Sequence, residues 1–171
     1  ILALRQGRIE GAGEVLRHCL DPLRSINDRV GLANALWVTG VVCMFMGRFQ
    51  EAIEYLQKAH AQALATNRQW ELCLSRILIG RVKHQLGDHN ESIRWLKEGL
   101  ALGQRMGDPN LITFGTSSLV DTEHALGQLE EMESLLRDGL LIATDNGSRF
   151  TYAMLQEQLA LVLHSKGKIS E

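Results

Sequence analysis

The chain has 171 residues, of which 45% are hydrophobic, 22% charged and 5% aromatic, a composition that suits one compact domain or one short repeat array. The formal charge of -2 lacks the broad positive field that nucleic acid or anionic lipid demands, so we expect no direct binding to either. The longest apolar stretch, residues 41–46, is too short to span a membrane, and the three cysteines fit neither a disulfide framework nor a metal-binding spacing, so we expect a cytoplasmic protein.

A 40-residue period organises the sequence. Glycines stand at this constant interval, at Gly7, Gly47, Gly87, Gly127 and Gly167. Such a period is typical of repeat architectures. We therefore expect residues 1–171 to form one array, with repeats near 8–46, 47–86, 87–126 and 127–166 and a truncated repeat from 167. We also expect the array to be a piece of a larger protein.

Each repeat is predicted to be a pair of antiparallel helices. A leucine follows each of the first four glycines by nine residues, so the buried positions recur with the repeat as well as within a helix. In chain order the expected helices cover 8–25, 28–46, 49–65, 68–86, 88–105, 108–126, 128–145 and 148–166. Pro22 falls inside the first of these, and we expect a break or kink after Leu20.

The helix ends are predicted from residues that accept a left-handed backbone or cap free N–H groups. Asn and Gly recur twenty residues before the repeat glycines and should end the helices expected at 8–25, 49–65, 88–105 and 128–145, at Asn27, Asn67, Gly107 and Gly147. The next residue is a predicted cap in three repeats: Asp28, Asp108 and Ser148. Pro109 suits the first position of its helix.

Residues 47–59 are similar to the second half of a tetratricopeptide repeat. The small residues of that motif match Gly40, Gly47, Ala52 and Ala59. Later repeats keep Gly80 and Ser92, whereas Gly99 and Gly139 replace the late alanine and Met132 replaces the early one. The 40-residue period, longer than the usual 34, resembles the repeat arms of bacterial signal-transduction ATPases, of LuxR-type transcriptional regulators, and of animal adaptors that orient the spindle.

The resemblance implies an all-α, right-handed solenoid whose inner groove is lined by the helices expected at 28–46, 68–86, 108–126 and 148–166. The family's groove positions fall on four rows of this sequence. These rows are Asn34, Trp37, Val41 and Met44; Leu74, Ile77, Arg81 and His84; Phe114, Ser117, Asp121 and His124; and Met154, Glu157, Leu161 and His164. A protein or peptide partner, or a small effector, would bind there.

Four groove residues have the most informative chemistry. Trp37, Met44 and Phe114 are residue types that anchor partners when desolvated, although packing between helices is the interpretation we favour for each aromatic taken alone. Arg81 is the best candidate for binding a carboxylate or phosphate. A pair with Asp121, or plain solvation, is the alternative that we favour for it.

No metal or cofactor site is predicted. His84, His124 and His164 recur every 40 residues and could bind metal or sense pH, but packed helices lie about 8–10 Å apart and no further ligands complete a set. We expect a structural role for them. Trp70 and Trp95 are predicted to pack in the core between repeats.

No enzymatic motif is present, since GxxxxGK[ST], GxGxxG, HExxH and GxSxG are all missing. The densest polar cluster, residues 121–124, points its members to different sides of a helix. We therefore expect no enzyme but a binding arm of a bacterial signalling or transcriptional regulator. A constitutive scaffold is the alternative, and phosphatase action on a response regulator is a third hypothesis that no residue pattern supports. Self-association through apolar ends of the array is a further expectation.

Overall fold

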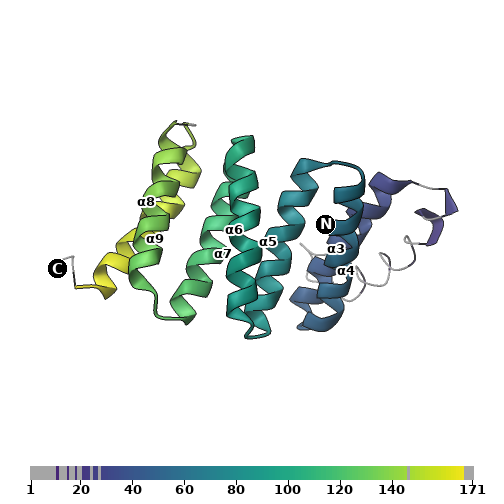
Figure 1. Ribbon diagram of the computed structural model, residues 1–171, viewed down its shortest axis with the longest axis horizontal. Helices are drawn as coiled ribbons and strands as arrows, with labels where there is room; N and C mark the ends of the chain where they lie inside the picture. The colour runs from purple at the N-terminus through teal and green to yellow at the C-terminus, as the bar shows by residue number, and fades with distance from the viewer. Residues whose placement is uncertain are drawn as a thin grey trace.

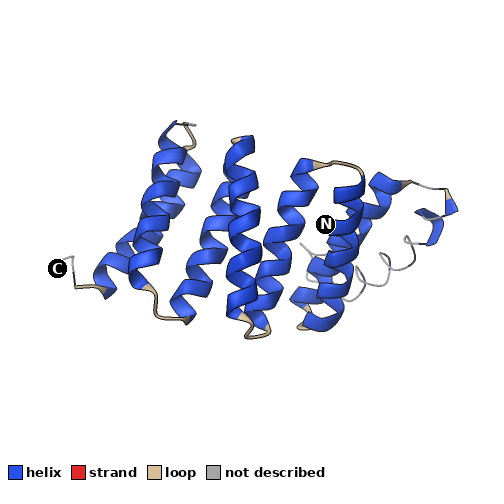
Figure 2. Ribbon diagram, in the orientation of Figure 1, coloured by secondary structure: helices blue, strands red, loops and turns tan. Residues whose placement is uncertain are grey.

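The computed structural model describes residues 28–145 and 147–167, together with Gly11, Val15, His18, Asp21, Pro22, Leu23, Ser25 and Ile26. Figure 1 shows its helices standing side by side in a row, and Figure 2 shows only helices and loops in this part of the chain. The elements are α3 (Arg29–Phe45), α4 (Phe49–Ala65), α5 (Gln69–Gln85), α6 (His89–Met106), α7 (Pro109–Ala125), α8 (Leu129–Asp145) and α9 (Arg149–Ser165).

The predicted helical hairpins are confirmed over the described residues. α3 and α4, α5 and α6, and α7 and α8 form the three described hairpins, and every boundary lies within about one residue of its expected place. We call α3, α5, α7 and α9 the A helices, and α4, α6 and α8 the B helices. The helix expected at 8–25 and the break after Leu20 fall mainly outside the described residues.

Left-handed residues end the helices at the predicted positions. Asn67 has a φ of 53° and is the one non-glycine residue with positive φ in the described part of the chain. The predicted Gly107 and Gly147 both have a φ of 66°, and the repeat glycines Gly47, Gly87, Gly127 and Gly167 are also left-handed, with φ between 65° and 79°. Asn27 lies outside the described residues.

Two of the three predicted caps form. The Asp28 carboxylate accepts a hydrogen bond from the Gly31 N–H at 2.9 Å, and Asp108 accepts one from the Leu111 N–H at 3.1 Å. The prediction for Ser148 is wrong, because its hydroxyl donates instead to the Thr151 hydroxyl at 2.9 Å.

The helices form two layers of unequal packing. Each A helix contacts the next A helix along the array, whereas no B helix contacts another B helix within the described residues. The B helices contact only their A neighbours on either side. Successive A helices therefore lie closer together than successive B helices do. This difference places the A helices on the inner, concave face of the solenoid.

Small residues let the first two hairpins close tightly. A Cβ atom added at Gly40 would lie 2.7 Å from Leu56 Cγ, and one added at Gly80 would lie 2.6 Å from Leu96 Cγ. The A helix of each hairpin therefore rests directly on a buried leucine of its B helix. In the third hairpin Val120 and Met132 occupy the positions of these small residues, and α7 and α8 make the least extensive contact of the three pairs.

The expectation that both tryptophans are core residues is wrong for Trp70. Its side chain is 43% exposed at the start of α5. Trp95 is half-buried against the cluster around Leu56 and Val82, and its ring meets His60 edge-on at a centroid distance of 5.3 Å.

In the described part of the chain, no helix has the length and apolarity that crossing a membrane requires.

Candidate functional site

An apolar pocket opens among the A helices α3, α5 and α7. It has a volume of about 360 Å³ and brings together six of the predicted groove residues, which were drawn from three separate rows. These are Trp37, Val41, Met44, Leu74, Arg81 and Phe114, joined by Phe45 and Leu78, which sequence reasoning missed. We call it the Arg81 pocket, since Arg81 is the one charged residue of its lining.

The Arg81 guanidinium lies over an aromatic ring. Its Cζ lies 4.8 Å from the centroid of the Phe114 ring, an arrangement that holds the side chain by cation–π attraction. Burial lowers the pKa of Arg81 from its ordinary value, and the Asp121 carboxylate opposes this effect. Among the described residues no carboxylate lies within ion-pair distance of Arg81. The predicted alternative of an Arg81–Asp121 pair is therefore not formed.

Ile77 does not line the groove, which corrects the sequence prediction. Its side chain is fully buried between α6 and α7, against Gly99 and Gly115, and belongs to the core around Leu96 and Ile112. One turn of helix separates it from Arg81, but the first points between the layers and the second into the pocket. Helical spacing shows which residues share a face, but it does not show whether that face is buried, so the spacing of Ile77 gave the wrong environment.

Other groove candidates are exposed or engaged with the protein. Asn34 is exposed, and its Oδ1 accepts a hydrogen bond from Trp37 Nε1 at 3.3 Å, which orients the indole. Ser117 bonds to the Gln158 side chain and so ties α7 to α9. Glu157 is exposed on α9 outside both described groove pockets.

The three recurring histidines do not converge. His84 pairs instead with His89, at a ring-centroid distance of 5.2 Å, and burial lowers the pKa of His84 from its ordinary value. His124 and His164 are exposed farther along the array. No three metal-ligating side chains come together in the ranges that the structure describes.

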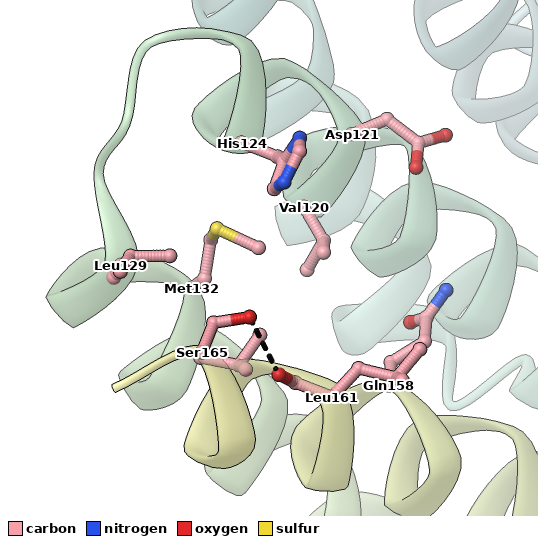
Figure 3. A pocket seen from close by; sticks show the side chains of 9 residues that line it. Val120, Asp121, His124, Leu129, Met132, Gln158, Leu161 and Ser165 are labelled. Atoms are coloured by element: carbon pink, nitrogen blue, oxygen red, sulfur yellow. Dashed lines mark hydrogen bonds between the residues drawn. The ribbon is translucent and has the colours of Figure 1, made fainter. Parts of the chain in front are cut away.

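A second pocket lies between α7, α8 and α9. It has a volume of about 230 Å³, and Figure 3 shows it framed by side chains from all three helices. Val120, Leu129, Met132, Leu161 and Val162 make it largely apolar, and Asp121, His124, Gln158 and Ser165 are its polar residues. We call it the Asp121 pocket. Asp121, His124 and Leu161 are predicted groove positions, whereas the other six were missed.

Residues 32–105 match the tetratricopeptide repeat family. This match spans the two hairpins formed by α3 with α4 and by α5 with α6. Of the three helices that line the Arg81 pocket, α3 and α5 lie within the matched region and α7 follows it directly. A module of tetratricopeptide repeats generally serves protein interaction.

Solved structures place the fold in the same group of TPR-like solenoids. A putative kinesin light chain from Podosopora anserina with nearly identical TPR-like repeats is 18% identical, with a TM-score of 0.80 over 97% of this chain and 82% of that one. BtubC from P. vanneervenii is 14% identical, with a TM-score of 0.82 over 98% and 70%.

A third similar structure adds a signalling protein to this group. It is a signal transduction ATPase with numerous domains, from Pyrococcus horikoshii, which has a tetratricopeptide repeat sensor. It is 19% identical, with a TM-score of 0.74 over 95% of this chain and 25% of that one. All three likenesses concern the fold of the repeats.

The tetratricopeptide pattern itself carries the signal for the residues that were missed. Its small positions recur at Gly40 with Ala52 and at Gly80 with Ser92, and fail at Val120 with Met132. The Asp121 pocket lies at the hairpin where the pattern fails. A departure from the family's spacing residues was therefore a better guide to this pocket than the groove rows were.

Proposed function

We propose that these tetratricopeptide repeats are the partner-binding arm of a bacterial signalling or transcriptional regulator that works in the cytoplasm, and that the Arg81 pocket is where the partner is held. The observation that carries the proposal is an unpaired, half-buried guanidinium set in a wall of aromatic and aliphatic side chains.

The chemistry of the pocket defines the group that it would take. Trp37, Met44 and Phe114 supply the kind of surface on which partner side chains gain most of their binding energy when water is excluded. Arg81 offers two parallel N–H donors, a geometry that matches a carboxylate. The partner segment would therefore place an apolar side chain in the pocket with a carboxylate directly beside it.

The regulator context is supported by likeness of fold. The Pyrococcus horikoshii ATPase, which has a tetratricopeptide repeat sensor, resembles 95% of this chain in fold. We propose by analogy that this array is joined to a nucleotide-binding switch or a helix-turn-helix domain. The reading frame around residues 1–171 tests this directly: a GxxxxGK[ST] motif or a helix-turn-helix supports a regulator, and a frame of further repeats alone favours a constitutive scaffold.

Partner binding is tested with variants of two residues of the Arg81 pocket and with a control variant outside it. Arg81→Ala and Trp37→Ala are compared with Arg94→Ala, which removes an exposed arginine from the B helix α6. Immobilised chain is incubated with extract of the source cells, retained proteins are identified by mass spectrometry, and circular dichroism verifies that each variant is folded.

The expected result is a protein that wild type and Arg94→Ala retain and that Arg81→Ala and Trp37→Ala lose. Retention of the same proteins by all four chains would contradict a role for the Arg81 pocket. Loss from the Trp37 variant alone would leave an apolar site but remove the carboxylate from the proposal.

A further inference from the structure

The Asp121 pocket exists because the third hairpin is held open. Val120 and Met132 are both buried, and Figure 3 shows their side chains directed into the space between the three helices. Glycine with alanine or serine fills the equivalent positions of the first two hairpins, where the helices close on a leucine. The cleft at this joint has a volume of about 230 Å³ and opens to solvent beside the exposed side chains of Asp121 and Leu161.

The polar edge of this cleft has one carboxylate, Asp121, and one imidazole, His124, and the Asp121 charge also interacts with Arg81 and His84 on α5. Asp121 is exposed and makes no hydrogen bond or ion pair among the described residues, and Figure 3 places it at the same edge as the Gln158 amide. No lysine or arginine lines the cleft. The charge is therefore opposite to that of the Arg81 pocket, although Arg81 and Asp121 occupy equivalent positions of successive A helices.

We propose that the Asp121 pocket binds a small apolar amine, with the aromatic or branched group between Val120, Met132 and Leu161 and the ammonium against the Asp121 carboxylate. The ligand class follows from size and charge. Cavities of about 150 Å³ lined by aliphatic side chains accommodate a benzene ring, so a single ring with a short aminoalkyl chain fits this space. Gln158 supplies a carbonyl oxygen that accepts a second hydrogen bond from the ammonium.

The inference rests on the proposed function in one respect, since residues of the A helices contribute to both pockets. The methionines allow the two to be tested separately. Met44 lines the Arg81 pocket and Met132 lines the Asp121 pocket. Methyl-labelled methionine therefore gives one NMR reporter in each, and single Met→Leu variants assign the signals.

The experiment titrates the labelled chain with 2-phenylethylamine, its neutral counterpart 2-phenylethanol, and the anion phenylacetate. We expect 2-phenylethylamine to shift the Met132 signal with an affinity about threefold to fivefold above that of 2-phenylethanol, the size of an exposed charge interaction. Phenylacetate is expected to shift Met44 instead. In Asp121→Asn the affinity for the amine should fall to that for the alcohol.

Glu157→Gln is the matched control, because Glu157 is an exposed carboxylate of α9 that does not line the cleft. It should leave the affinity for the amine unchanged. Equal binding of amine and alcohol, an unmoved Met132 signal, or equal losses in the Asp121 and Glu157 variants would overturn the proposal. A shift of the Met44 signal by phenylacetate in the same titrations would support the proposed function of the Arg81 pocket. An unmoved Met44 signal together with a shifted Met132 signal would contradict that function alone.

Discussion

Arg81 of α5 lies over the ring of Phe114 on α7, with the guanidinium carbon 4.8 Å from the ring centroid. The contact joins two successive A helices across the floor of the pocket that both residues line. It therefore holds the guanidinium in place without consuming the hydrogen bonds that a ligand would use.

The first prediction concerns the energy of this contact. A double-mutant cycle with Arg81→Met and Phe114→Leu should give a coupling free energy of about 0.5–2 kcal/mol in urea unfolding, because the pair is partly desolvated. Lys58→Met with Tyr55→Leu is the control cycle, since Lys58 is exposed and its Nζ lies 5.5 Å from the Tyr55 centroid. A coupling no larger than that of the control would show that Phe114 does not hold Arg81.

The second prediction concerns the close approach of α5 and α6. Gly80→Ala should lower the free energy of unfolding by about 1–3 kcal/mol, because the new methyl group would overlap Leu96 and approach the Ser92 carbonyl oxygen, 3.1 Å away. The higher helix propensity of alanine, about 1 kcal/mol, acts in the opposite direction.

Gly103→Ala is the matched control for this substitution. A Cβ atom at Gly103 would meet Leu111, Cys73 and Ile112 at 3.3–3.6 Å, which requires little movement. The same gain in helix propensity then meets little opposition, so this variant should be unchanged or up to about 1 kcal/mol more stable than wild type. A stabilised Gly80→Ala protein in thermal or urea unfolding would mean that the hairpin can open at no cost.

The third prediction concerns pH. Glu123 is buried, with its Oε2 atom unbonded, and burial raises the pKa of this carboxyl above its ordinary value of 4.5. Lys97 opposes this shift and Glu131 adds to it. The protonated form is favoured in the folded state, so the stability that it contributes is complete below pH 4.5 and is lost as pH rises through the raised pKa.

Glu123→Gln removes the charge and with it this dependence on pH. The variant should therefore gain stability relative to wild type as pH rises from 4.5 toward neutrality, as measured by urea unfolding at a series of pH values. Glu131→Gln, on the exposed side of α8, is the control that should show a smaller gain. A difference between Glu123→Gln and wild type that stays constant with pH would argue that the carboxyl is hydrated.

The fourth prediction compares two carboxylates that contact the same lysine. Lys166 binds both Glu130 and Glu133, whose side chains are 79% and 8% exposed. Glu133→Gln should lower the free energy of unfolding by about 1–3 kcal/mol, because it weakens a buried charge-assisted hydrogen bond. Glu130→Gln should change it by less than about 0.5 kcal/mol in the same measurement. Equal effects would show that burial does not set the strength of this pair.

The helices and their ends were predictable because backbone chemistry repeats along the chain. Each left-handed turn needs glycine or asparagine, and such residues recur at fixed places in every repeat. Asn67 shows that the turn does not require glycine, since its φ of 53° matches the glycines at the equivalent positions. Local conformation of this kind depends on few neighbours, so the sequence alone carried enough information.

The faces of the A helices were less predictable, because these helices pack on both sides. Ile77 and Arg81 stand four residues apart on α5, yet one is core and the other lines a pocket. Trp70 was expected in the core and is 43% exposed. Whether a neighbour covers a side chain depends on how successive repeats stack, and a residue pattern within one repeat does not contain that information.

The open third hairpin also determines how the array bends. In an array whose hairpins contact only their neighbours, each interface deforms separately, and the interface with the least packing deforms most. The softest joint here is α7 against α8, where Val120 and Met132 keep the helices apart. We therefore expect bending to be concentrated at this joint, with α3 to α6 moving together so that much of the Arg81 pocket keeps its shape while α9 is displaced.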